Sequence, residues 1–344
     1  MHHDVRSTFI GVFAAAGILA FAAGAQAQTI ELKMSTFLPP PHGANTDFYP
    51  WWRDELAKRT GGKVKLTLFP AGSAFGQLEP QFDQARDGAV DISHGLTSQP
   101  RGRFPRTSIM DVPFLAKTAD GMSRTLWALF DKYLAEEYKG VKVLALHAHN
   151  GGLIHTRDRE IKVADDLKGL RVRAPSAAVT EMLKYLGADA VALPAPAIYE
   201  NMQKGVIGGF VMPWDPIYSF KLQEVTKYHL SAGTYTVSFF VVMNQRKYDS
   251  LPADVRKAID ETTGQSLVNR FGPWWDAWDA KGREVAEKAG NKINQLSEAE
   301  REDWRRKLQP MIDAYLSSVE KQGVANAREI YAEAQKLAQQ FEKK

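Results

Sequence analysis

"DDLKGLRVRAPS", residues 165–176, joins a short apolar strand to the start of a helix and carries two arginines one residue apart. Because side chains alternate along a strand, Arg171 and Arg173 point to one face and the residues between them to the other. Pro175 fixes the backbone after the strand, and Ser176 is a typical N-cap for the helix that follows. Arg173 is therefore expected at the carboxyl end of a strand, beside a helix amino terminus.

That position favours a negatively charged ligand. In open α/β sheets ligands bind beyond the carboxyl ends of the strands, and a helix amino terminus adds partial positive charge there. A guanidinium at such a point can hold a carboxylate by two parallel hydrogen bonds. A structural salt bridge is the alternative for either arginine at this stage.

The same alternation of strand and helix extends outward from this stretch. It predicts α/β layers with mostly parallel sheets. The expected strands are 29–35, 63–69, 141–149 and 234–244, and the expected helices are 47–61, 176–187 and 195–205. From about residue 280 the pattern becomes helical and heavily charged, which indicates long C-terminal helices with a solvated face.

Composition excludes several classes of protein. The 344 residues include no cysteine, so disulfides, thiolate metal sites and cysteine catalysis are excluded. The net charge of +4 is small against 44 basic and 40 acidic residues, which argues against nucleic acid as a partner. With 44% hydrophobic residues a chain of this length can bury a sizeable core without cross-links.

Residues 1–27 have the pattern of a secretory signal peptide. An apolar run over 8–25 ends at Ala25-Gln26-Ala27, a small-residue cleavage site. A retained membrane anchor is the alternative, but the apolar run is short and no stop-transfer pattern follows it. We therefore expect an exported mature chain that begins near residue 28.

No catalytic or cofactor motif is present in the sequence. It contains no G-x-S-x-G elbow, no phosphate-binding loop and no H-E-x-x-H. His147 and His149 lie two apart on a predicted strand, but no carboxylate or thiolate ligand is adjacent, so no metal is expected. "WWDAWD" (274–279) has the spacing of a packing surface, with ligand stacking as the alternative. We expect no catalytic residue, no metal and no cofactor.

The chain resembles the periplasmic solute-binding proteins of tripartite ATP-independent periplasmic (TRAP) transporters, the DctP-type family. The matching stretches occur in order over nearly all of the mature chain: "TGGKVKLTLFPAGSAFGQ" (60–77), "DGAVDISHG" (87–95), "MDVPFL" (110–115), "DDLKGLRVRAP" (165–175), "IYENMQKGVIGG" (198–209) and "MNQRKYDSLPADVRKAI" (243–259). The resemblance implies a two-lobed α/β periplasmic-binding-protein fold, with strands crossing between the lobes and a ligand closed between them. It implies that 28–150 and 239–279 form lobe I, and that 151–238 and 280–344 form lobe II with the C-terminal helices.

The resemblance also implies a binding site. The family's carboxylate-binding arginine matches Arg173, which leaves Arg171 on the solvent or lobe surface. Where many members have an aspartate and an asparagine, this chain has Gly208 and Met212, and where some members have a second arginine it has Leu153. At Met212 and Leu153 this chain thus has apolar side chains where those members have polar ligand contacts.

These departures predict the ligand class. We expect Leu153, Met212, Trp214 and Phe37 to meet the apolar body of the ligand, and Asn150, His149 and His42 to hydrogen-bond a hydroxyl or keto group on it. The expected ligand is an aromatic or otherwise apolar monocarboxylate. A C4-dicarboxylate or a 2-oxo or hydroxy acid is the alternative on the same fold, and a secreted hydrolase is a more remote one.

The resemblance further implies a setting. The chain would be a periplasmic monomer that captures a small organic acid and passes it to the membrane subunits of a TRAP transporter. A chemosensory binder on the same fold is the alternative for the partner. Turnover of candidate esters would distinguish the hydrolase from either binding protein.

Overall fold

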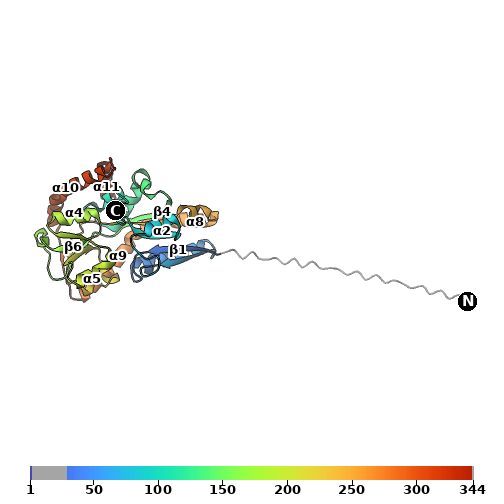
Figure 1. Cartoon of the computed structure of the whole chain (residues 1–344), viewed down its shortest axis with the longest axis horizontal. Coiled ribbons are helices and arrows are strands. Elements are labelled where there is room, and N and C mark those ends of the chain that lie inside the picture. The colour runs from blue at the N-terminus through green and yellow to red at the C-terminus, as the bar shows by residue number, and fades with distance from the viewer. Residues whose placement is uncertain (2–28, 343–344) are drawn as a thin grey trace.

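A computed structural model describes residue 1 and residues 29–342, so the predicted signal peptide lies outside the described residues. The described chain forms two β-sheets side by side with helices packed around them (Figure 1). None of the described helices is long and apolar enough to cross a membrane. The α/β class expected from the sequence is confirmed.

The first sheet has five strands in the order β2-β1-β3-β10-β4. Its strands are β1 (Ile30–Thr36), β2 (Val64–Phe69), β3 (Ile92–Leu96), β4 (Val141–Ala148) and β10 (Ser238–Asn244). The second sheet has six strands in the order β11-β9-β5-β8-β6-β7. Its strands are β5 (Leu153–Thr156), β6 (Arg171–Ala174), β7 (Asp189–Ala192), β8 (Gly209–Met212), β9 (Tyr228–Ser231) and β11 (Lys292–Gln295).

One strand in each sheet runs against the others. In the first sheet β10 pairs antiparallel with β3 and β4, and in the second β5 pairs antiparallel with β8 and β9. All other pairs are parallel. The two reversed strands are those that the chain enters directly from the other sheet, β5 from β4 and β10 from β9. The prediction of mostly parallel sheets therefore holds except at the two crossings.

The two crossing segments, residues 149–152 and 232–237, lie side by side. Gly152 N donates to Tyr235 O at 2.7 Å, and Thr234 N donates to Gly152 O at 3.2 Å. A side chain on Gly152 would lie 2.2 Å from the Tyr235 ring, so only glycine permits this approach. The link between the sheets is thus a hydrogen-bonded pair of segments, with glycine at its closest point.

Helices cover the sheets and bridge them. Their bounds are α1 (Tyr49–Arg59), α2 (Gln81–Asp87), α3 (Ala119–Leu129), α4 (Ala177–Tyr185), α5 (Ile198–Gln203), α6 (Asp215–Ser219), α7 (Gln245–Ser250), α8 (Ala253–Thr262), α9 (Gln265–Lys288), α10 (Glu298–Lys321) and α11 (Ala327–Glu342). The long helix α9 packs on α3 and β4 and also on α6, so it joins the two halves.

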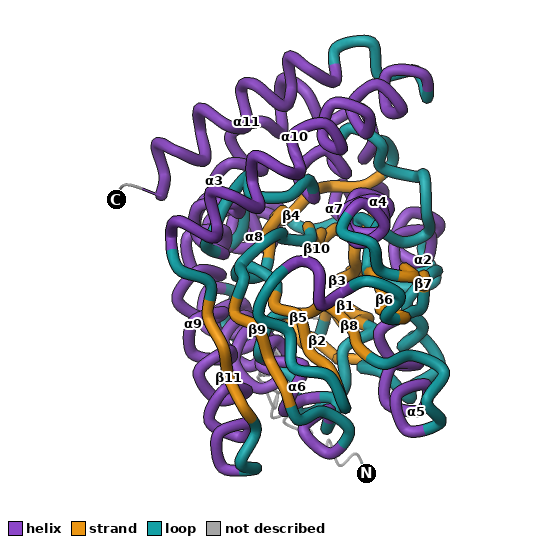
Figure 2. The backbone as a smooth tube through the Cα atoms, turned by 90° about the vertical axis from the view of Figure 1, so that its left-hand side faces the viewer, coloured by secondary structure: helices purple, strands orange, loops and turns teal. Residues whose placement is uncertain are grey.

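The C-terminal helices α10 and α11 lie together along one side of the molecule (Figure 2). Helix α10 packs on α4 beside the second sheet, while α11 packs on α3 beside the first. Strand β11 belongs to the second sheet. The lobe boundaries expected at 150/151, 238/239 and 279/280 stay a prediction.

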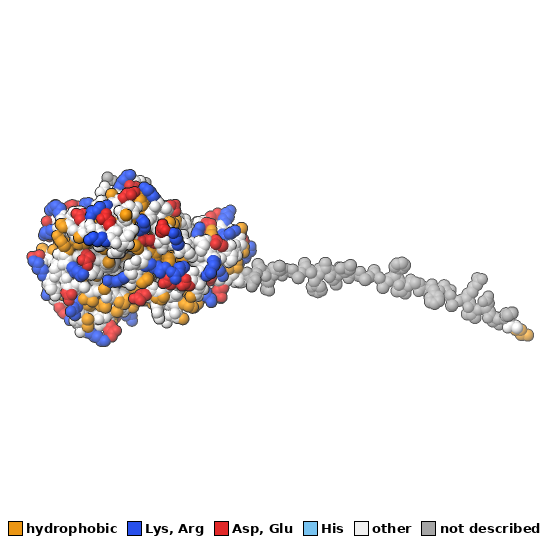
Figure 3. Space-filling model, turned by 45° about the horizontal axis from the view of Figure 1, so that its top comes forward, with side chains coloured by type: hydrophobic (Ala, Val, Ile, Leu, Met, Phe, Trp, Pro, Cys, Tyr) orange, Lys and Arg blue, Asp and Glu red, His pale blue; other side chains and the backbone are white. Residues whose placement is uncertain are grey.

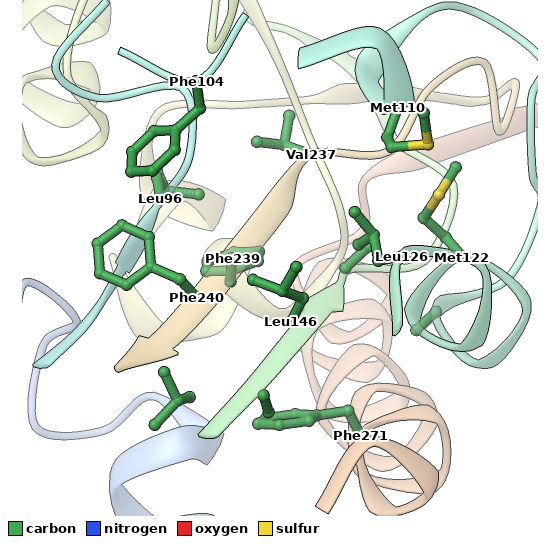
Figure 4. Packing of buried hydrophobic residues seen from close by; sticks show 14 of the residues in the cluster. Leu96, Phe104, Met110, Met122, Leu126, Leu146, Val237, Phe239, Phe240 and Phe271 are labelled. Atoms are coloured by element: carbon green, nitrogen blue, oxygen red, sulfur yellow. The ribbon is translucent and has the colours of Figure 1, made fainter. Parts of the chain in front are cut away.

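The core is centred on β10, all of whose residues are buried. Such a run is typical of a strand that has both faces covered by helices. Phe240 points to the side of Phe82, with ring centroids 5.5 Å apart. Phe239 lies among the buried residues next to Phe240 in Figure 4 and has its ring on the other side, where it stacks on His147 and meets Trp275 of α9. On the surface, basic and acidic side chains are mixed over the face that Figure 3 shows.

The crossing segments generate a first testable prediction. Replacing Gly152 with alanine should cost about 1–3 kcal/mol in the free energy of unfolding, because the new methyl group would overlap the buried Tyr235 ring. Gly208→Ala is the matched control, since its methyl would meet only the flexible end of Leu170 at 2.7 Å. Urea denaturation of both variants measures the difference. Equal stability of the two variants would contradict the close packing described for the crossing.

Candidate functional site

The two arginines of strand β6 have different surroundings although they share a face. Arg171, at the start of the strand, is half exposed and pairs with Asp189 on the neighbouring strand at 2.9 Å. Arg173, at the carboxyl end, is only 3% exposed. Ser176 accepts a hydrogen bond from Val179 N at 3.5 Å and caps α4, as expected. The structure therefore has Arg171 at the surface and Arg173 in the interior.

Arg173 is a buried cation without an anionic partner. Its Nε donates to Leu193 O at 2.8 Å and its Nη1 to Val211 O at 3.4 Å. Within residues 29–342 no carboxylate lies within 4.0 Å of this guanidinium. Burial lowers the pKa of Arg173 to about 10, so the side chain is still charged at neutral pH. Burying a charge without a partner is costly, which makes this guanidinium a strong candidate for holding an external anion.

The guanidinium faces a small cavity of about 40 Å³ between the two sheets. Five of the residues selected from the sequence line it: Phe37, His42, His149, Arg173 and Met212. Most of the remaining wall is apolar: Leu38, Leu96, Pro175, Ala195, Val211, Pro213, Pro216, Phe220, Tyr235, Val237, Phe239 and Trp275. The cavity thus combines one charged group with apolar surroundings.

Both cavity histidines have their ring nitrogens occupied. His42 Nδ1 accepts from Ala44 N at 3.0 Å, and its Nε2 lies 3.1 Å from Asp215 Oδ1. His149 Nδ1 donates to Asn150 O at 2.5 Å, and its Nε2 accepts from Val237 N at 3.1 Å. Burial lowers their pKa values to about 3 and about 4, so both rings are neutral. The structure does not support the expectation that they hydrogen-bond a ligand hydroxyl or keto group, because neither has a free nitrogen.

Three other residues selected from the sequence do not line the cavity. Asn150 is used within the fold, since its Oδ1 accepts from Ala119 N at 2.7 Å and its Nδ2 donates to Asp279 at 3.1 Å. Leu153 is the cross-strand partner of Met212 and is buried in the same hydrophobic cluster. Trp214 packs on His155 and His229, with ring centroids 5.5 and 5.0 Å away. These side chains fill space or satisfy backbone groups instead.

The structure adds wall residues that the sequence reasoning missed. Tyr235 and Val237 of the second crossing segment and Phe239 of β10 alternate along the chain, and all three line the cavity. Period-two alternation in "TYTVSFF" could have indicated this shared face. Trp275 of "WWDAWD" also lines the cavity, and its Nε1 donates to His147 Nδ1 at 3.3 Å. Its indole therefore offers a ring surface to the cavity, not a free donor.

A larger groove of about 650 Å³ lies next to this cavity, between the loop at 97–111, α4 and α10. Its walls are mixed, with Arg101, Glu181 and Lys184 beside apolar side chains. The buried unpaired guanidinium is in the smaller cavity, which we therefore take as the candidate site. No three His, Asp or Glu side chains of the described chain gather as a metal site would require.

Comparison with known proteins identifies the family. The model of "Bacterial extracellular solute-binding protein, family 7", DctP, matches residues 35–318. The chain belongs to this family. Like the proteins described below, it is a TRAP solute-binding protein, as its resemblance in sequence implied.

Two solved structures are similar over almost their whole length. A TRAP solute-binding protein from Rhodoferax ferrireducens, in complex with copurified benzoate, is 35% identical with a TM-score of 0.87, covering 92% of this chain and 99% of its own. A marine metagenome TRAP solute-binding protein specific for aromatic acid ligands, with 3-hydroxybenzoate, is 32% identical with a TM-score of 0.85, covering 91% and 99%. The protein TsaT of Comamonas testosteroni, called an outer membrane transporter protein, is 28% identical over 90% of this chain and 92% of its own.

The buried histidines of this binding protein predict acid sensitivity. Burial lowers the pKa of six histidines: His42, His94, His147, His149, His155 and His229. Between about pH 6.5 and pH 4 the unfolded chain protonates these residues and the folded chain does not, so stability falls as the pH falls. Burial raises the pKa of four carboxyl groups, which opposes this effect: Asp111, Glu137, Asp215 and Asp279.

The six histidines outnumber the four carboxyl groups, so we expect the free energy of unfolding to fall as the pH falls from about 6.5 toward 4. Thermal unfolding at pH 7 and pH 5 measures this directly. A midpoint at pH 5 equal to or above that at pH 7 would show that the histidines are not buried in their neutral form.

Proposed function

We propose that this binding protein captures an aromatic or otherwise apolar monocarboxylate in the periplasm and delivers it to the membrane subunits of a TRAP transporter. The observation that carries the proposal is the Arg173 guanidinium, which is buried and charged and has only backbone carbonyls as partners within the described chain. A ligand carboxylate would supply the missing anion through charge-assisted hydrogen bonds. The protein would act as a monomer, without catalysis or a cofactor.

The cavity is suited to one carboxylate only. Arg173 is the single charged side chain among the described residues that line it, because both histidines are neutral. A second carboxylate would lose its hydration with no second cation to compensate. This argues against a C4-dicarboxylate, the main alternative ligand.

The rest of the wall favours a ring. Phe37, Phe239, Trp275 and Met212 surround the space beyond the guanidinium. Burying an aromatic ring there gains about 25 cal/mol per Å² of apolar surface removed from water. Met212 adds a sulfur that makes favourable contacts with aromatic rings. The benzoate and 3-hydroxybenzoate found in the two similar structures support the same ligand class.

The same wall argues against a hydrolase. Apart from Tyr235, the residues of the described chain that line the cavity include no hydroxyl or thiol nucleophile, and neither histidine has a nitrogen free to act as a base. Acyl transfer needs a nucleophile and a base within hydrogen-bond reach. Capture and release of an intact acid needs neither.

Arg173 should carry the affinity for the ligand carboxylate. Arg173→Ala should weaken benzoate binding by about two to three and a half decades, since it leaves a desolvated carboxylate unpaired at a cost of about 3–5 kcal/mol. Arg173→Lys should also bind poorly, because an ammonium does not reproduce the planar fork. Isothermal titration calorimetry measures both variants.

The matched control is Arg171→Ala, which removes an arginine from the same strand face but from the half-exposed pair with Asp189. Its affinity for benzoate should stay within about twofold of wild type, as expected for a surface pair. A larger loss in Arg171→Ala than in Arg173→Ala would overturn the assignment of the site.

Ligand class is tested by a thermal-shift screen of the wild-type protein. Benzoate, phenylacetate and cinnamate should raise the unfolding temperature, because a ligand at a hundredfold over its dissociation constant adds about 2.7 kcal/mol of stability. Succinate and malate should give little or no shift. Stabilisation by the dicarboxylates alone would reject the proposed ligand and favour the alternative.

A further inference from the structure

The Tyr235 hydroxyl is a second polar group of the cavity without a partner. Tyr235 lines the cavity and is 1% exposed, and its hydroxyl makes no hydrogen bond with any described residue. Buried polar groups in folded proteins are nearly always hydrogen-bonded, so an orphan in a ligand cavity calls for an explanation. A bound ligand would supply the missing acceptor.

The surrounding contacts hold this phenol in a fixed place. Its ring packs against the backbone of Gly152, where a side chain would lie 2.2 Å from the ring. The ring also meets His149 edge-on, with centroids 5.5 Å apart and planes at 88°. The backbone of Tyr235 is hydrogen-bonded to the opposite crossing segment through Gly152 N. The position of the hydroxyl is therefore set before any ligand binds, which lowers the entropic cost of using it.

The hydroxyl is a neutral donor that lines the same cavity as the guanidinium. Burial raises the pKa of Tyr235 well above its usual value, and Asp111 acts in the same direction. Arg173 is near enough to lower that pKa in part by its charge. The phenol thus stays protonated at physiological pH. It can therefore donate a hydrogen bond to an anion that Arg173 holds.

The remaining polar groups of the cavity are already engaged. His42 and His149 use both ring nitrogens, and the Trp275 Nε1 donates to His147. Among the side chains of the described residues that line the cavity, only Arg173 and Tyr235 retain unused hydrogen-bonding capacity. Polar recognition of a ligand by side chains is therefore limited to these two.

We propose that the Tyr235 hydroxyl donates a hydrogen bond to the ligand carboxylate beside Arg173, and that these two side chains form the complete polar contact set, so that the site prefers monoacids with no further hydroxyl or keto group. This inference rests on the proposed function and narrows its ligand class. The carboxylate is held at one end of the cavity by a residue of β6 and a residue of the second crossing segment. Everything beyond it meets rings and aliphatic groups.

Tyr235→Phe tests the contact, because it removes the hydroxyl and keeps the ring that packs on Gly152. Hydrogen bonds to charged groups contribute enough that we expect benzoate affinity to fall about 10- to 100-fold. Without ligand the variant should be at least as stable as wild type, since it loses a buried hydroxyl that has no partner. A merely structural role for Tyr235 would lower stability and leave affinity unchanged.

Tyr49→Phe is the matched control. Tyr49 is also a buried tyrosine, but its hydroxyl lies near Thr36 and it does not line the cavity. Removing the Tyr49 hydroxyl should leave the affinity for benzoate within about twofold of wild type. If Tyr235→Phe and Tyr49→Phe lost the same affinity for benzoate, the loss would come from removing any buried hydroxyl. That result would overturn the proposed contact between Tyr235 and the ligand.

The selectivity is tested by comparing pairs of acids on the wild-type protein by calorimetry. 3-Hydroxybenzoate should bind more weakly than benzoate, and mandelate more weakly than phenylacetate, each by about 10- to 100-fold, the range within which an apolar pocket rejects an added hydroxyl. Equal or tighter binding of the hydroxy acids would contradict the proposal that Arg173 and Tyr235 are the only side chains that make polar contacts with the ligand. If no monoacid binds wild type, the proposed function itself fails; if benzoate binds wild type and Tyr235→Phe equally, only this inference fails.

Discussion

A buried guanidinium without a counter-ion is the constraint on which the rest of this structure depends. Arg173 is 3% exposed and meets only two backbone carbonyls, at Leu193 and Val211. Keeping such a charge out of water is unfavourable unless other interactions offset it, and among the described residues these two carbonyls accept from it but no carboxylate pairs with it. The anionic ligand that we propose would resolve the imbalance. The same ligand would bury its apolar part in the adjoining wall, so charge and hydrophobic burial act together.

The site exists because two separate sheets meet. Its wall comes from the loop after β1, from β6 and β8 with the turns that follow them, from α9 and from the second crossing segment. The crossing segments are held together through Gly152, whose lack of a side chain makes room for Tyr235. Backbone geometry at one glycine thereby positions the Tyr235 side chain in the cavity wall. The bridging helix α9 contributes Trp275 to the same wall while joining both halves.

Much of the fold could be predicted because it depends on local patterns. Alternation of strands and helices indicated the α/β class, and Ser176 indicated the start of α4. The two reversed strands were not predicted, since their direction depends on which sheet the chain enters next. Arg173 could be selected from its place at a strand end, and Phe37, His42, His149 and Met212 also proved to line the cavity. Asn150, Leu153 and Trp214 did not, because their contacts are set by distant partners such as Asp279 and His229.

By itself, the sequence determined the alternating elements, the absence of thiol chemistry and the arginine at the end of β6, because each depends on residue type and short-range spacing. Only the tertiary structure decided which polar groups remain free. The two cavity histidines look available in the sequence, yet Ala44, Asp215, Asn150 and Val237 occupy every ring nitrogen. Tyr235 looks like an ordinary core residue, yet its hydroxyl has no hydrogen-bond partner among residues 29–342. Whether a polar group already has a hydrogen-bond partner depends on which residues folding brings next to it. Those residues are distant in the sequence, so spacing along the chain does not reveal them.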